Sequence, residues 1–416
     1  MKINNDPVYV KRRRVALAVL IVVLIVLVVC IGRLVGGDET ASAGTPQQAA
    51  APAKRAAPAK VEKAAPAVKP EQKQGKEAAP ADSSMVRIQR LTGTMTPKSV
   101  VASPTGHVFA QNMMYSHSVT ALTPDGAIEK TISDAVKLSD FGVKGHPGTS
   151  KGAPVEMAFS PDGKTAWVSN YAMYGAGFSP EGADACTGPE GISDSYLYKI
   201  DTDSLEIKDV VRVGAVPKYV AATHDGSKVL VTNWCSMDLD IVDTAKGEVV
   251  TTIPIDGKHP RGIAITPDDK VAFVAVMGSD KTVRVDLESG KTSDFAATGD
   301  GPRHLLVSPD GSKLYISNNG AGTVSEVDAT TGKTLREVQV GSEPRSMAIS
   351  PDGGAIYVGN YGSSTVSKIR TKHFEVVQTE KTDALPIGIT YEPTKKRVWV
   401  ASYGGSIIVF DDSRTV

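Results

Sequence analysis

The sequence predicts an all-β fold that is built from seven copies of one small antiparallel sheet. After residue 96 a pattern recurs seven times: a proline, an apolar run, a turn of the Pro-Asp-Gly type, and a second apolar run that commonly ends in Asn. The turns of the seven copies begin at Pro104, Pro161, His224, Pro267, Pro309, Pro351 and Pro393. The successive gaps are 57, 63, 43, 42, 42 and 42 residues. A period near 42 residues suits four short strands per copy, and seven such sheets close into a β-propeller.

The fifth copy illustrates how one repeat is expected to fold. Its first two strands, 302–308 and 313–318, flank the turn 309–311 (PDG). Proline presets φ in such a turn and glycine accepts a positive φ, which favours a hairpin. A third strand at 323–328 and a fourth at 335–340 follow. Four strands of this length bury little surface alone, so each sheet is expected to pack face to face against its neighbours.

The two ends of the repeat array are complementary. The last copy stops after its third strand, 406–411, whereas an extra strand, 85–91, precedes the first copy. We expect this N-terminal strand to complete the last blade, because the closure removes an exposed sheet edge.

The second strands of the repeats share a short signature. It reads YISN at 315–318, YVGN at 357–360, LVTN at 230–233 and WVSN at 167–170, with a weaker copy, FAQN, at 109–112. In this respect residues 85–416 resemble the YVTN family of seven-bladed β-propeller proteins. The resemblance implies the architecture and little about activity, because propellers serve as binding modules and as several types of enzyme.

The first 84 residues predict a membrane tether. Residues 1–14 form a basic cytoplasmic tail, 15–35 a transmembrane signal-anchor helix, 36–84 a disordered Ala/Pro/Lys-rich linker, and 85–416 the propeller. The apolar run 15–32 is just long enough to span a bilayer. The basic residues before it predict a cytoplasmic N-terminus and an extracytoplasmic propeller, in the periplasm or at the cell surface. A cleaved signal peptide is the alternative, because Ala41-Ser42-Ala43 has the small-x-small form of a cleavage site.

The charge distribution argues against a nucleic-acid partner. The formal charge of the whole chain is zero, but residues 1–84 contain 13 basic and 7 acidic residues. The propeller is therefore left with a net charge of −6. A mildly acidic domain lacks the basic footprint that nucleic acids require.

Two of the three cysteines, Cys186 and Cys235, lie in the predicted exported domain. They occupy loops of neighbouring blades, and disulfides persist outside the cytoplasm. We therefore predict a Cys186–Cys235 disulfide.

Two insertions predict where the functional surface lies. The connection at 135–153 and the loop at 172–194 account for the two long gaps in the repeat. Both are expected on one face of the ring, and insertions on one face of a repeat protein commonly mark its binding surface.

Two sets of side chains on this face are candidates for ligand binding. The residue after the opening proline of each blade is basic in five of seven copies, namely Lys98, Lys218, Arg261, Arg303 and Arg345. Such a ring would attract anions, unless each cation pairs with a carboxylate of a neighbouring blade. The position after the signature Asn is aromatic in four copies, namely Tyr171, Trp234, Tyr361 and Tyr403. These rings could grip a ligand or simply pack between blades.

The function expected from these features is that of a binding or scaffolding module of the bacterial cell envelope. Its expected partner is an envelope protein or an anionic glycan or other cell-wall component. The alternative is a lactonase-like hydrolase or lyase with its chemistry at the channel mouth, where His259, His304 and Glu156 could meet. Their spacing is not that of a metal site, so we predict no catalytic residue, no metal ligand and no cofactor.

Overall fold

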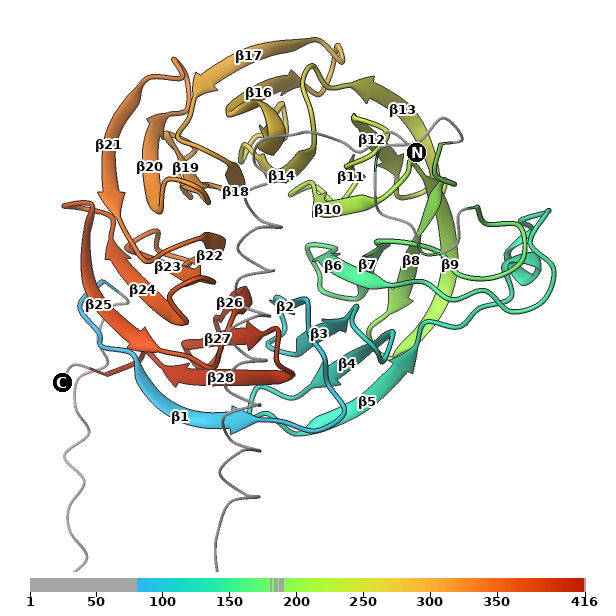
Figure 1. Cartoon of the computed structure of the whole chain (residues 1–416), viewed down its shortest axis with the longest axis horizontal. Coiled ribbons are helices and arrows are strands. Elements are labelled where there is room, and N and C mark those ends of the chain that lie inside the picture. The colour runs from blue at the N-terminus through green and yellow to red at the C-terminus, as the bar shows by residue number, and fades with distance from the viewer. Residues whose placement is uncertain (1–80, 180–181, 183–185, 187–190, 415–416) are drawn as a thin grey trace, which may run out of the picture. The chain divides into compact units, whose positions relative to one another are not determined.

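The computed structural model describes residues 81–179, 182, 186 and 191–414. These residues form a closed ring of seven four-stranded antiparallel sheets around a central channel (Figure 1). The predicted all-β, seven-bladed propeller is therefore confirmed. No helix in this part of the chain is both long and apolar enough to cross a membrane. The predicted anchor at 15–35 and the linker up to residue 80 lie outside the described residues.

Blades one to six run from their innermost to their outermost strand along the chain, and blade seven does so for its three inner strands. Blade one consists of β2 (Ser99–Ala102), β3 (Val108–Asn112), β4 (Ser118–Leu122) and β5 (Ile128–Ser133). Blade two consists of β6 (Pro154–Phe159), β7 (Thr165–Asn170), β8 (Ser195–Asp201) and β9 (Glu206–Val213). Blade three consists of β10 (Pro217–Ala222), β11 (Lys228–Asn233), β12 (Asp238–Asp243) and β13 (Glu248–Pro254).

The remaining blades repeat the same order. Blade four consists of β14 (Pro260–Ile265), β15 (Val271–Val276), β16 (Lys281–Asp286) and β17 (Thr292–Ala297), and blade five of β18 (Pro302–Val307), β19 (Lys313–Asn318), β20 (Thr323–Asp328) and β21 (Thr334–Gln339). Blade six consists of β22 (Pro344–Ile349), β23 (Ala355–Asn360), β24 (Thr365–Arg370) and β25 (Glu375–Lys381). Blade seven contains β26 (Pro386–Glu392), β27 (Arg397–Ser402) and β28 (Ser406–Asp411).

The N-terminal strand closes the ring, as predicted. Strand β1 (Val86–Leu91) pairs antiparallel with β28 and completes blade seven, so the first and last strands of the domain lie side by side (Figure 1). Residues 81–84, which the sequence assigned to the linker, also contact the propeller: the amide of Ser84 donates to the carbonyl of Arg414 at 2.9 Å.

The signature Asn residues hold the second and third strands of a blade together. The Asn318 side-chain amide donates to Thr323 Oγ1 at 3.0 Å and to Ser325 Oγ at 2.8 Å. Asn360 repeats this contact with Thr365 and Ser367. One amide thus satisfies two hydroxyls in a buried turn, which explains why the repeat ends its second strand in Asn.

Both insertions project from blades one and two beyond the rim of the ring (Figure 1). The first, which follows β5, contains the short 3₁₀ helix η1 (Leu138–Phe141); a second 3₁₀ turn, η2 (Met277–Ser279), belongs to blade four. The two insertions pair with each other through Lys151 and Tyr174, so they emerge on the same side. The predicted Cys186–Cys235 disulfide is present and ties the second insertion to blade three.

Candidate functional site

The backbone aims one residue of each innermost strand at the mouth of the channel. In blades two to seven the pairing register shifts directly after the opening proline. A β-bulge of this kind inserts one residue and redirects its side chain. The residues at this point are Lys218, Arg261, Arg303 and Arg345, together with Val155 and Ile387. Lys98 has the equivalent position in blade one, directly before β2, where the pairing register does not shift.

The backbone just before these bulges is strained. Val216, His259, Glu343 and Leu385 each precede an opening proline and have φ values of 57°, 65°, 52° and 61°. Side chains with a Cβ rarely adopt this left-handed conformation, and a β-branched residue such as Val216 is a pronounced outlier. Strain of this kind clusters at functional sites in proteins.

The five cations form one electrostatic cluster, which we call the basic ring. Lys98, Lys218 and Arg303 are buried, with 9%, 8% and 8% of their surface exposed. Burial holds the pKa of Lys98 well below its usual range, and the charges of the other four members lower it further. The pKa of Arg303 is lowered in the same way by burial and by Arg261 and Arg345. The five cations therefore lie close enough for their charges to act on one another, and their role in ligand binding stays a prediction.

Two carboxylates compensate part of this charge in the described residues. Glu343 lies 3.2 Å from Arg345 and also acts on Arg303, and Glu156 acts on Arg261 and interacts with Lys98. Even with Glu156 nearby, burial lowers the pKa of Arg261 to about 10. Glu343 and Glu156 thus compensate part of the ring, in line with the alternative interpretation of these positions.

The ring also contains unused hydrogen-bond donors. The Nε atoms of Arg303 and Arg345 are buried and lack a partner within the described part of the chain. The Arg303 Nη1 atom reaches only the sulfur of Met277, at 3.8 Å. Leaving charged donors buried without acceptors is costly, so an anionic acceptor in the mouth would relieve this cost.

The aromatic residues position the cations. The Lys218 ammonium lies 3.6 Å from the centroid of the Tyr171 ring and 4.9 Å from that of Trp234. The Arg345 guanidinium lies 3.4 Å from the Tyr361 centroid. Cation–π contacts of this kind hold a charge in place and still leave its hydrogen-bond donors available.

The remaining aromatic faces at the mouth are also occupied. Trp234 stacks on His259, with the ring centroids 4.3 Å apart. Tyr403 meets Tyr361 edge to face and donates its hydroxyl to the sulfur of Met114. These residues therefore behave largely as packing and positioning groups, as in the alternative that the sequence left open.

A pocket of about 230 Å³ lies along the same innermost strands. Residues that immediately follow ring positions line it: Ser99, Glu156, Tyr219, His304, Ser346 and Gly388. Burial raises the pKa of Glu156 to about 7, although Arg261 and Lys98 oppose the shift. Tyr219 was missed at the sequence level; its position, two residues after the opening proline, was the available signal.

The three residues considered for a metal site do not form one. His259 stacks on Trp234, whereas both nitrogens of His304 have partners, Tyr219 Oη and the amide of Met347, each at 2.9 Å. Among the described residues no group of three or more His, Cys, Asp or Glu side chains is arranged to hold a metal ion.

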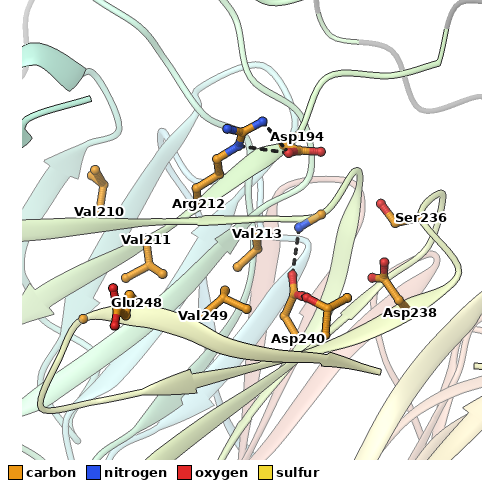
Figure 2. Close-up of a pocket in the computed structure, with 13 residues that line it drawn as sticks. Asp194, Val210, Val211, Arg212, Val213, Ser236, Asp238, Asp240, Glu248 and Val249 are labelled. Carbon is orange, nitrogen blue, oxygen red and sulfur yellow. Dashed lines mark hydrogen bonds and ion pairs between the residues drawn. The ribbon is translucent and has the colours of Figure 1, made fainter. Parts of the chain in front are cut away.

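A larger cleft, of about 460 Å³, lies between the outer strands β9 and β13 (Figure 2). Arg212 and Asp194 form an ion pair there, with Arg212 Nη2 2.8 Å from Asp194 Oδ2. Asp240 accepts hydrogen bonds from the Gly214 amide, the Asn233 side chain and Thr252. Because Arg212, Asp194 and Asp240 already have partners, this cleft is a weaker candidate than the basic ring.

Comparison with known proteins supports the fold. Residues 193–342 match the protein family described as lactonase, 7-bladed β-propeller. The chain is a seven-bladed β-propeller with YVTN-like repeats. A structure of hydrazine synthase from Kuenenia stuttgartiensis superimposes with a TM-score of 0.61 at 17% sequence identity, over 78% of this chain and 98% of that chain. At this identity the likeness shows the fold alone. No curated protein sequence matches the chain.

Proposed function

We propose that this propeller is a binding module of the cell envelope and that its basic ring holds a ligand with several negative charges. One observation carries the proposal: five cations act on one another at the start of the innermost strands, three of them are buried, and the buried Nε atoms of Arg303 and Arg345 have no hydrogen-bond partner in the described residues. Natural proteins rarely bury unpaired charge unless a partner completes the site. The strained backbone before three of the ring residues, Lys218, Arg261 and Arg345, supports the same conclusion.

The ligand is recognised mainly through charge. Because ring cations or neighbouring rings lie on the faces of Tyr171, Trp234 and Tyr361, stacking on sugar rings contributes little. Suitable partners are the acidic tail of an envelope protein or a glycan or wall polymer that carries carboxylate, phosphate or sulfate groups. Desolvated cations attract such oxyanions strongly because the local dielectric is low.

The proposed location is extracytoplasmic, with the chain tethered by the helix predicted at 15–35. The apolar run and the basic residues before it support this placement. The Cys186–Cys235 disulfide is also typical of a protein outside the cytoplasm.

A lactonase-like hydrolase or lyase is the second candidate. The family match over residues 193–342 favours it. A carboxyl with a pKa near 7, as in Glu156, is also suited to general acid–base chemistry at neutral pH. Turnover of small lactones that disappears in Glu156→Gln would favour this enzyme over the binding module.

The binding proposal can be tested on the full-length protein in detergent, with a fluorescent oligo-glutamate peptide and an oligogalacturonate as probes. The variant Arg303→Met/Arg345→Gln removes two ring cations without introducing a buried negative charge. We expect it to bind at least one of these probes about thirtyfold more weakly than wild type, since desolvated charge contacts are strong. Arg212→Gln is the matched control, because Arg212 is a cation of the rim cleft. Equal losses in both variants, or no binding to wild type, would contradict the proposal.

A further inference from the structure

The pocket beside the basic ring contains a hydrogen-bond chain whose proton positions can be assigned. The amide of Met347 lies 2.9 Å from His304 Nδ1. An amide N–H can only donate, so Nδ1 accepts and carries no proton. Burial, together with Arg261 and Arg303, lowers the pKa of His304 to about 3. The imidazole is therefore neutral at physiological pH, and its single proton sits on Nε2.

The position of the His304 proton determines how the Tyr219 hydroxyl takes part in the hydrogen bond. His304 Nε2 lies 2.9 Å from Tyr219 Oη, so the imidazole N–H donates to the phenol oxygen. The hydroxyl proton of Tyr219 then needs an acceptor of its own, because a phenol that receives a hydrogen bond still has one to give. In the described residues the hydrogen bond with His304 is the one that this hydroxyl makes.

Three other hydroxyl groups of the pocket already have partners, and the Glu156 carboxylate of the same pocket acts on Tyr219 through its charge. The Ser346 hydroxyl donates to the carbonyl of Ile387 at 2.7 Å, and Ser99 donates to Gln111. Thr390 Oγ1 accepts the amide of Ala102 at 3.0 Å. Tyr219 is thus a donor oriented by His304, in a pocket lined by residues that immediately follow ring positions along the chain.

We propose that the Tyr219 hydroxyl donates to an uncharged oxygen of the ligand, either a hydroxyl or a carbonyl, while the basic ring holds the ligand's oxyanions. The inference rests on the proposed function, because the proposed function places the negative charges of the ligand at the basic ring. The ligand class is then a hydroxy or oxo acid with more than one negative charge. A pocket of about 230 Å³ admits a small acid or the terminal acidic sugar of a glycan, but not a folded chain.

Citrate and tricarballylate provide a matched pair of probes, since the two tricarboxylates differ only in the central hydroxyl. Binding to the full-length protein is measured by isothermal titration at a pH of about 7.5, where both acids are ionised. We expect wild type to bind citrate about fivefold more tightly, as one added hydrogen bond implies. Tyr219→Phe keeps the ring and removes the hydroxyl, so it should abolish this preference while leaving the affinity for tricarballylate unchanged.

The possible outcomes separate the two proposals. Equal affinity of wild type for both acids, or an equal loss for both in Tyr219→Phe, overturns the role of Tyr219 and leaves the anion site intact. Failure of wild type to bind any anion overturns the anion site itself. A trimeric oligogalacturonate distinguishes the two sources: tighter binding than citrate indicates a glycan end, and weaker binding indicates a free acid.

A spectroscopic measurement tests the positioning role of His304 independently of affinity. Nitrogen-15 chemical shifts of the His304 ring should show a protonated Nε2 and an unprotonated Nδ1, with no titration down to a pH of about 5. A proton on Nδ1, or titration near the ordinary pKa of histidine, would overturn the orientation of the Tyr219 hydroxyl.

Discussion

Two buried lysines of this propeller have opposite surroundings. Lys368, at the seam where the ring closes, is completely buried, and its ammonium donates to Asp412 Oδ1 at 2.7 Å. It also donates to the Ser83 carbonyl at 2.8 Å and to the Ser83 hydroxyl at 2.9 Å. Lys98, in the basic ring, is nearly as buried, but the charges that most affect it are four other cations.

The difference between the two lysines distinguishes a buried charge that stabilises the fold, Lys368, from one proposed to bind a ligand, Lys98. At the seam every donor of Lys368 is directed at an acceptor, and the contact joins strand β24 to the residues that flank β1 and β28. Such a satisfied pair specifies one geometry of closure. At the ring, five cations are gathered, and the buried Nε atoms of Arg303 and Arg345 have no acceptor in the described residues. Binding of an anion would stabilise this arrangement.

The largest expected effect follows from breaking the seam. Lys368→Met leaves Asp412 buried and without its cation, and removing one partner of a buried pair costs about 3–5 kcal/mol. We expect the free energy of unfolding, measured by denaturant titration, to fall by this amount. The double variant Lys368→Met/Asp412→Leu should recover most of the loss, because no charge is then left unpaired. Unchanged stability of Lys368→Met would show that the seam pair is not structural.

The ring should respond in the opposite direction. Arg303→Met removes a buried cation with an unpartnered Nε atom, and Met fills a similar volume. We expect the free energy of unfolding without ligand to rise by about 1–2 kcal/mol, because the cost of desolvating that charge disappears. Anion binding should weaken in the same variant. Lower stability of Arg303→Met would mean that the ring is as well compensated as the seam.

The architecture could be predicted from the sequence because it depends on repetition. Turn residues such as Pro309 and Gly311 recur at a fixed period, so one blade predicts the others. The closure by residues 85–91 followed from a missing strand at the other end. The buried Lys368–Asp412 pair could not be predicted, because it joins two blades with no periodic signal of its own.

The site was predictable only in part. The basic ring followed from equivalent positions in successive repeats, but the degree to which carboxylates compensate it depends on side-chain placement. Glu156, Tyr219 and His304 come from three different blades and have three different chemistries. A repeat pattern reveals what positions share, so it could not show that these dissimilar residues line one pocket.

The smallest expected effect concerns pH and also tests how the ring is compensated. Below a pH of about 7 Glu156 is protonated, because burial raises its pKa to about 7, and the ring then has its highest positive charge. Above that pH the carboxylate competes with the ligand for Arg261. Binding of inorganic sulfate, which does not titrate in this range, should therefore weaken about fivefold between pH 7 and 8.

Glu156→Gln is the control for this pH dependence, because the amide cannot ionise. The step near pH 7 should be absent in this variant, and its affinity at pH 8 should approach that of wild type at pH 6. His304 remains neutral across this range and does not contribute to the step. Any loss of charge on Lys98 affects Glu156→Gln and wild type alike, so the pH dependence of the variant can be subtracted from that of wild type. A step of equal size in Glu156→Gln would assign the titration to Lys98. Glu156 would then not be the counter-ion that competes with the ligand, and the basic ring would differ from the Lys368–Asp412 seam even more.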